Sequence, residues 1–165
     1  MTETVTALQE NFRQTMRRMA ATVSIITTAT EDTRLGMTAT SATCVSFEPL
    51  SMLVCVHKGS KFHDLMAKSD TFCINLLHQS QENISNHFSR PGNGEDQFTL
   101  GQWSMKNGLP FLEEAQANIF MTVKKVTGFG SHSLFIGEVT DLQYAADIAP
   151  LLYADGNYAG LKAAS

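Results

Sequence analysis

The sequence predicts a mainly β protein, an antiparallel barrel with appended helices. Short apolar and β-branched runs, bounded by turn residues, recur along most of the 165-residue chain. Helical segments interrupt these runs without the strict strand–helix alternation of a doubly wound parallel sheet. Inserted helices between antiparallel strands favour a barrel. A chain of this length suits one well-packed domain, and we expect 1–165 to form it.

The N-terminal segment predicts an amphipathic helix over about residues 8–20. Leu8, Phe12, Met16 and Met19 recur at helical spacing, with arginines between them. We interpret the apolar side of this helix as a packing surface.

The barrel is expected over about residues 22–161. Its predicted strands cover 23–28, 35–47, 52–56, 72–77, 118–126, 133–142, 150–153 and 158–161. The second of these is long enough to bend or bulge, and Pro49 ends it. Short helices are expected after Ser60 and over 81–88, and the Ser-, Pro- and Gly-rich stretch 89–94 is the strongest loop signal, a candidate lid.

Charge and hydropathy exclude several classes of protein. A formal net charge of -4 and a pI near 5.7 argue against a nucleic-acid partner, because binding the phosphate backbone requires a positive surface. No segment approaches the roughly 20 apolar residues of a membrane helix. The N-terminus has no signal-peptide or transit-peptide pattern, so we expect a cytoplasmic protein. The low charged fraction, 17%, leaves surface for a subunit interface.

Cysteine and histidine spacing favours neither a disulfide framework nor a metal site. Cys44, Cys55 and Cys73 each lie in an apolar stretch and match no zinc pattern, so we interpret them as reduced and buried. The five histidines show no i, i+4 or Cys-rich spacing typical of a closed site. We therefore predict no metal.

Residues 36–43 form a run of small, hydroxyl-bearing residues where a strand would otherwise fill the core. Thr and Ser hydroxyls, with backbone N–H groups, can hold a phosphate without a lysine. The same run also fits a strand whose exposed face carries Thr and Ser. Both interpretations remain open from the residues alone.

A second candidate anion site follows a buried strand. Ser60 and His63 stand at a predicted helix start, where unpaired N–H groups favour anions. The alternative is a Ser60 that only caps the helix. Asn75 is a polar residue inside an apolar strand, so it requires either a backbone partner or a place in a ligand site.

The glycines at 128 and 130 begin like a dinucleotide fingerprint. The third glycine is missing and the segment leads into a strand, so we reject a Rossmann site. A sharp turn would instead present His132 at a strand start, either as a surface residue or beside a flat ring.

Four stretches in this order, 36–43, 57–64, 72–77 and 130–139, with the opening 12–20, resemble the short-chain flavin reductase family. Its members are the reductase halves of two-component flavin monooxygenases. The resemblance runs from about Phe12 to Tyr158. It implies an antiparallel Greek-key split β-barrel of the FMN-binding type, and a homodimer with the flavin near the subunit interface. It also implies hydride transfer from NADH or NADPH to FMN or FAD, and delivery of reduced flavin to a partner monooxygenase.

The resemblance implies two groups of site residues. The flavin contacts are Thr38, Ala39, Thr40, Ser41, Ala42, Cys44, Ser60, Lys61, Phe62, His63 and Asn75. The nicotinamide side takes Tyr153, Gly156 and Tyr158, with His132 as the catalytic residue. The chain departs from the family where His57, Lys58 and Gly59 replace an Asn-Arg-Ser-like segment, and where Ala154 and Asp155 stand in place of an arginine near Gly156.

Two other functions are carried as alternatives. A non-catalytic flavin-binding module would bind flavin without oxidising NAD(P)H. An enzyme resembling pyridoxamine phosphate oxidase, on the same barrel, would require more basic residues around the phosphate. The sequence has no G-x-S-x-G elbow, and Glu113, Glu114 and Glu138 define no acid/base pair.

Overall fold

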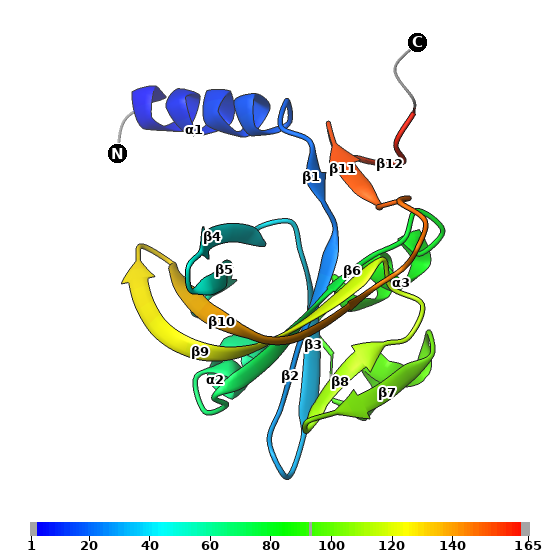
Figure 1. Ribbon diagram of the computed structural model, residues 1–165. Helices are drawn as coiled ribbons and strands as arrows, with labels where there is room; N and C mark the ends of the chain where they lie inside the picture. The colour runs from blue at the N-terminus through cyan, green and yellow to red at the C-terminus, as the bar shows by residue number, and fades with distance from the viewer. Residues whose placement is uncertain (1–2, 93, 163–165) are drawn as a thin grey trace.

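A computed structural model describes residues 3–92 and 94–162. Its main sheet is antiparallel and seven-stranded, in the order β3-β2-β6-β9-β10-β5-β4 (Figure 1). In chain order its strands are β2 Ser24–Ala29, β3 Arg34–Ala39, β4 Thr43–Phe47, β5 Leu50–His57, β6 Thr71–Leu76, β9 Ala117–Phe129 and β10 His132–Tyr144. The predicted mainly β, antiparallel barrel is confirmed.

A short crossing closes this sheet into a barrel. β3 and β4 are the two edge strands of the sheet, yet only residues 40–42 connect them. Four Cα–Cα steps reach at most about 15 Å, because consecutive Cα atoms are about 3.8 Å apart. In a flat sheet, edges separated by six strand spacings would be about 29 Å apart. The sheet must therefore curl until its edges approach.

Smaller elements surround the barrel. A three-stranded sheet has the order β1-β11-β12, and β7 pairs with β8 in a hairpin. Their bounds are β1 Ala21–Thr22, β7 Trp103–Lys106, β8 Leu109–Leu112, β11 Leu152–Ala154 and β12 Asn157–Ala159. The helices are α1 Glu3–Met16, α2 Lys61–Met66, α3 Glu82–Phe88 and the 3₁₀ helix η1 Glu95–Thr99. None of the helices in the described ranges is long and apolar enough to cross a membrane.

Two sequence expectations about elements are corrected, and one element was missed. The single strand expected over 35–47 is two strands, because the chain leaves β3 after Ala39 to reach the opposite edge. The N-terminal helix ends at Met16, where the Arg17 carbonyl accepts a bond from Asp155 N at 2.9 Å instead of continuing the helix. The β7–β8 hairpin was not predicted, because its strands are short and follow a polar loop.

The helix α1 packs differently from the sequence expectation. Figure 1 shows it projecting away from the barrel at the top of the molecule. Its apolar side chains face solvent in the single chain: Leu8 is 70%, Phe12 63% and Met16 39% exposed. The apolar positions therefore recur at helical spacing as expected, but the barrel of the described chain does not cover them.

The barrel interior holds one apolar cluster, and a second lies between the barrel, α3 and the surrounding loops. The first includes Ile26, Val54, Phe72, Ile74, Met121 and Phe135. The second includes Val23, Ile25, Leu77, Phe88 and Phe98. The strand β2 is buried on both faces, because successive side chains point to opposite sides: Ile26 belongs to the first cluster and Ile25 to the second.

Asn75 is fully buried and fully bonded. Its Nδ2 donates to Ile25 O at 2.9 Å and to Thr27 Oγ1 at 3.2 Å. Its Oδ1 accepts from Leu112 N at 2.9 Å and from Asn118 Nδ2 at 2.8 Å. Asn75 thus joins β6 to three neighbouring strands, and this resolves its polarity within an apolar strand.

Replacing Asn75 with Ala should lower the free energy of unfolding by about 3 kcal/mol, because it leaves buried groups such as Leu112 N without a partner. Urea denaturation of Asn75→Ala measures this. Asn11→Ala, at an exposed position of α1, is the control and should stay within about 0.5 kcal/mol of the unaltered chain. Equal midpoints for both variants would contradict the assignment.

Candidate functional site

Two adjoining hollows open beside the end of β3. The first, the Ser60 pocket, has a volume of about 430 Å³ and is lined by residues 35–38, 59–62 and 88–92 with Gln97. The second, the Tyr158 pocket, has a volume of about 450 Å³. Its lining residues are Val23, Thr38, Ala39, Thr40, Ser85, Asn86, Ser89, Tyr153, Gly156 and Tyr158. Thr38 and Ser89 belong to both, so the hollows meet there.

A close contact between β3 and α3 shapes the Ser60 pocket. A Cβ on Gly36 would lie 2.5 Å from Phe88 Cε1, so only glycine lets the Phe88 ring lie against the strand. The buried Gln97 side chain pairs with the same glycine, accepting from Gly36 N at 3.1 Å and donating to Gly36 O at 3.0 Å. The edge of β3 is thereby closed by a side chain in place of another strand.

A charged contact also holds η1 against β3. Arg34 donates to both Glu95 carboxylate oxygens, at 2.9 and 2.7 Å, and its guanidinium lies 4.3 Å from the centre of the Phe98 ring. The hydrogen bond from Arg34 lowers the pKa of the Glu95 carboxyl. These contacts hold η1 against β3, and Gln97 of η1 lines the Ser60 pocket.

Ser60 caps α2. Its Oγ accepts from His63 N at 3.1 Å and donates to His57 O at 2.8 Å. The single hydroxyl proton is therefore used within the protein, and the cap expected as the alternative from the sequence is present. Ser60 also lines the first hollow with Lys61 and Phe62, so the segment contributes a cation and an aromatic wall there.

The Tyr158 pocket is built by hydrogen bonds between β3, α3 and the β11–β12 hairpin. Thr38 Oγ1 donates to Ser85 O at 2.6 Å. Tyr158 Oη lies 2.8 Å from Ser85 Oγ and donates to Asn86 Oδ1 at 3.2 Å. The Tyr153 and Tyr158 rings meet edge to face, with centroids 5.3 Å apart. Three segments distant in sequence thus form one polar and aromatic surface.

Several expected site residues lie outside both hollows. Ser41 Oγ donates to Cys55 O and accepts from Cys55 N, both at 3.3 Å, and so ties the crossing to β5. Ala42 packs against the barrel core. Cys44 is exposed on β4, which corrects the expectation that all three cysteines are buried.

Asn75 corrects the expectation of a cofactor contact, because it is 0% exposed and all its polar groups are bonded inside the protein. Cys73, two residues earlier on β6, is also buried, and burial raises the pKa of its thiol. This stretch of β6 is structural.

The two expected site histidines lie near the β5–α2 junction. His63 Nε2 is 2.9 Å from Ser133 Oγ, and its ring meets Phe135 edge to face. His132 is exposed, pairs across the strands with His57, and has its ring centroid 5.2 Å from that of His57. Among the described residues, neither histidine lines the Ser60 pocket or the Tyr158 pocket, whereas Tyr153, Gly156 and Tyr158 line the latter.

Sequence reasoning missed the contribution of α3 and the loop after it. Ser85, Asn86, Ser89 and Arg90 line the hollows, yet none carries a motif of its own. The available signal was the strong loop pattern over 89–94, which predicted a lid. Residues 89–92 of this stretch line the Ser60 pocket.

The fold is an antiparallel split barrel, and two hollows of ligand size open beside the end of β3. Together these features define a ligand-binding protein of the split-barrel class. The family model described as "Flavin reductase like domain" matches residues 16–162, and the chain belongs to this family.

Known proteins of similar sequence and structure agree with this membership. The chain is 40% identical over 162 residues to the reductase component of the FADH(2)-dependent resorcinol hydroxylase of a Rhizobium species, covering 93% of this chain and 90% of that protein. It is 30% identical over 148 residues to the FMN reductase (NADH) RutF of Pseudomonas syringae, covering 89% and 83%. The NADH:FAD oxidoreductase SgcE6 of Streptomyces globisporus, solved with NAD and FAD fragments, superposes with a TM-score of 0.88 at 26% identity, covering 93% of each chain.

Blocking the junction of the hollows should weaken flavin binding. Thr38→Phe places a ring where the two meet, and we expect flavin affinity to fall by roughly tenfold or more, about 1.4 kcal/mol per tenfold. Titration by flavin fluorescence measures it. Thr43→Phe, at an exposed position of β4 outside both hollows, should bind flavin as the unaltered chain does. Equal affinities for the two variants would place the flavin elsewhere.

Proposed function

We propose that this chain is a flavin reductase that transfers a hydride from NADH or NADPH to FMN or FAD and supplies reduced flavin to a partner monooxygenase. The observation that carries the proposal is the pair of hollows that meet at Thr38 and Ser89. Two ring systems must come into contact for hydride transfer, and adjoining hollows provide a place for each. Two relatives support the same chemistry: the reductase component of an FADH(2)-dependent hydroxylase and an FMN reductase that uses NADH.

The residues present fit a flavin. Each hollow falls within the usual range of ligand pockets, roughly 300–1,000 Å³. The Ser60 pocket combines apolar walls from Phe62 and Phe88 with the ammonium group of Lys61, which suits a ligand with an aromatic part and a phosphate. The Tyr158 pocket adds hydroxyl and amide groups.

When both are bound, the nicotinamide supplies the hydride and the flavin accepts it. The protein's contribution is then positioning and exclusion of water, and this role requires no acid/base pair among the described lining residues of the hollows. We assign Thr38, Ala39 and Thr40 to the flavin ring and Ser60, Lys61 and Phe62 to its phosphate end. Tyr153, Gly156 and Tyr158 are assigned to the nicotinamide side.

The first test of the proposal is turnover. The purified protein should oxidise NADH or NADPH only when FMN or FAD is present, and the loss of nicotinamide absorbance measures this. The control is the same mixture without flavin. Flavin binding without nucleotide oxidation, in all four combinations, would favour the non-catalytic flavin-binding module. Oxidation of pyridoxamine phosphate by the purified protein would favour the other alternative, the enzyme resembling pyridoxamine phosphate oxidase.

His132 stays a proposed positioning residue for the nicotinamide. His132→Ala should slow flavin reduction or raise the KM for NAD(P)H by about tenfold, while flavin affinity changes little, because the reaction requires no proton from this side chain. Stopped-flow reduction across a nucleotide series separates these effects. The control is His78→Ala, because the His78 ring bonds to Ser80 and, among the described residues, lines neither the Ser60 pocket nor the Tyr158 pocket. Unchanged nucleotide kinetics in His132→Ala would leave this residue a surface turn residue.

We also propose a homodimer, supported by the unpacked apolar side of α1, on which Leu8 and Phe12 are 70% and 63% exposed. A second copy would cover this side. The cytoplasmic location and the identity of the partner monooxygenase stay predictions.

A further inference from the structure

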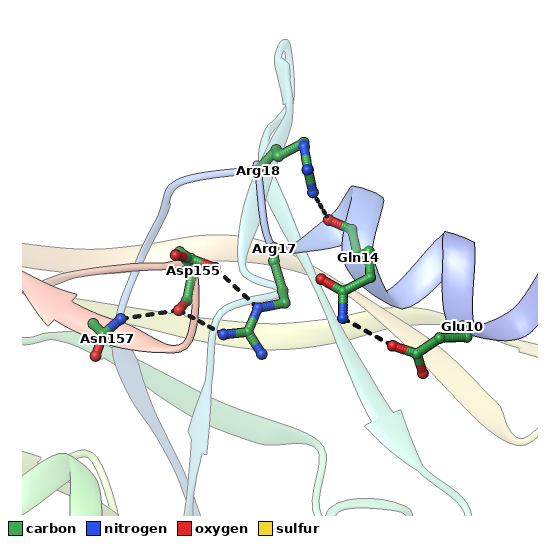
Figure 2. A network of polar contacts seen from close by, with 6 residues as sticks. All are labelled: Glu10, Gln14, Arg17, Arg18, Asp155 and Asn157. Carbon is green, nitrogen blue, oxygen red and sulfur yellow. Dashed lines mark hydrogen bonds and ion pairs between the residues drawn. The ribbon is translucent and has the colours of Figure 1, made fainter.

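Arg17 forms hydrogen bonds with the turn of the β11–β12 hairpin. Asp155 and Gly156 occupy the turn with φ of 51° and 78°, the left-handed pair of a two-residue hairpin. Arg17 Nε donates to Asp155 Oδ1 at 3.0 Å, and Nη2 donates to Asp155 O at 2.9 Å (Figure 2). Asp155 N in turn donates to Arg17 O at 2.9 Å. Asn157 Nδ2 completes the turn by donating to the same Asp155 carbonyl at 2.9 Å.

The guanidinium group lies directly over Gly156. A Cβ built on this glycine would be 3.0 Å from Arg17 Nη2, 3.5 Å from Cζ and 3.7 Å from Nη1. Gly156 lines the Tyr158 pocket, so a cation stands at the rim of this hollow. In the part of the chain that the structure describes, Nη1 of Arg17 has no hydrogen-bond partner.

The Tyr158 pocket has no positive charge of its own among its described lining residues, which are apolar, hydroxyl, amide or glycine residues. A nicotinamide dinucleotide carries a pyrophosphate with two negative charges, and anions of this kind are usually held by charge-assisted hydrogen bonds. Arg18, the next arginine, instead donates to Gln14 O within its own helical segment (Figure 2).

We propose that Arg17 supplies the positive charge for the pyrophosphate of the nicotinamide nucleotide at the Tyr158 pocket, an inference that rests on the proposed function. Asp155 orients the guanidinium through Nε and Nη2 and leaves Nη1 for the ligand. The Asp155 carboxylate also opposes the approaching anion, because its side chain is exposed and lies within bonding distance of the guanidinium. Arg17 and Asp155 should therefore affect nucleotide affinity with opposite signs.

Opposite signs distinguish this role from a purely structural one. Arg17→Gln removes the charge, and we expect the Kd and the KM for NADH to rise roughly three- to tenfold. Asp155→Asn keeps an oxygen that can accept from Nε but removes the negative charge, so the same two constants should fall or stay equal. Arg17→Lys keeps the charge without the planar fork and should be intermediate. If Arg17 only fastened the hairpin, both Arg17→Gln and Asp155→Asn would weaken nucleotide binding.

The experiment titrates NADH by fluorescence and separately measures its KM with flavin saturating. Arg18→Gln removes the same charge from the neighbouring position and is the matched control, with constants expected within about twofold of the unaltered chain. Flavin affinity should be unchanged in all four variants. Added salt should reduce the difference between Arg17→Gln and the unaltered chain.

Equal effects of Arg17→Gln and Arg18→Gln, or weaker NADH binding in Asp155→Asn, would overturn the inference, as would a failure of the unaltered chain to bind NADH. The proposed function fails separately: a chain that binds NADH but does not reduce flavin would contradict the reductase, while the direct titration would still decide the role of Arg17.

Discussion

The three-residue crossing from β3 to β4 is the constraint on which the rest of the structure depends. It forces the edges of a seven-stranded sheet together. The sheet therefore curls around a closed apolar core. The strand β3 ends where the two edges of the sheet approach each other, a place we call the seam. Because the crossing leaves the sheet at Thr40, the polar end of β3 stays open to ligands, and both hollows lie there.

The site is assembled around the end of β3 by segments that come from the middle and from both ends of the chain. The helix α3 and the following loop cover one side, since Gly36 admits the Phe88 ring and Thr38 bonds to Ser85. The β11–β12 hairpin covers another through Tyr158. The segment after α1 is joined to the same hairpin through Arg17, so the N-terminal segment is linked to the wall of the Tyr158 pocket.

The sequence was sufficient to predict the fold class and most strands, because each strand is a short β-branched or apolar run with a turn at its ends. It did not predict where the run over 35–47 breaks, since both halves are good strand formers and only the closure of the barrel separates them. In the site, the Thr/Ser run and the Ser60 segment were found because hydroxyl clusters are visible in sequence. The sequence did not show which hydroxyls face a ligand, because Ser41 and Ser60 donate their protons to backbone carbonyls. The role of α3 depends on tertiary packing alone.

The central claim is that ligands of this barrel bind beside the open end of β3. Hydrogen exchange with and without saturating FAD or FMN tests it most directly, because amides covered by a ligand or held by its contacts exchange more slowly. The account predicts slower exchange over 36–41, 59–63 and 85–92, with no change in the β7–β8 hairpin over 103–112. Protection confined to that hairpin, or absent from the end of β3, would contradict it.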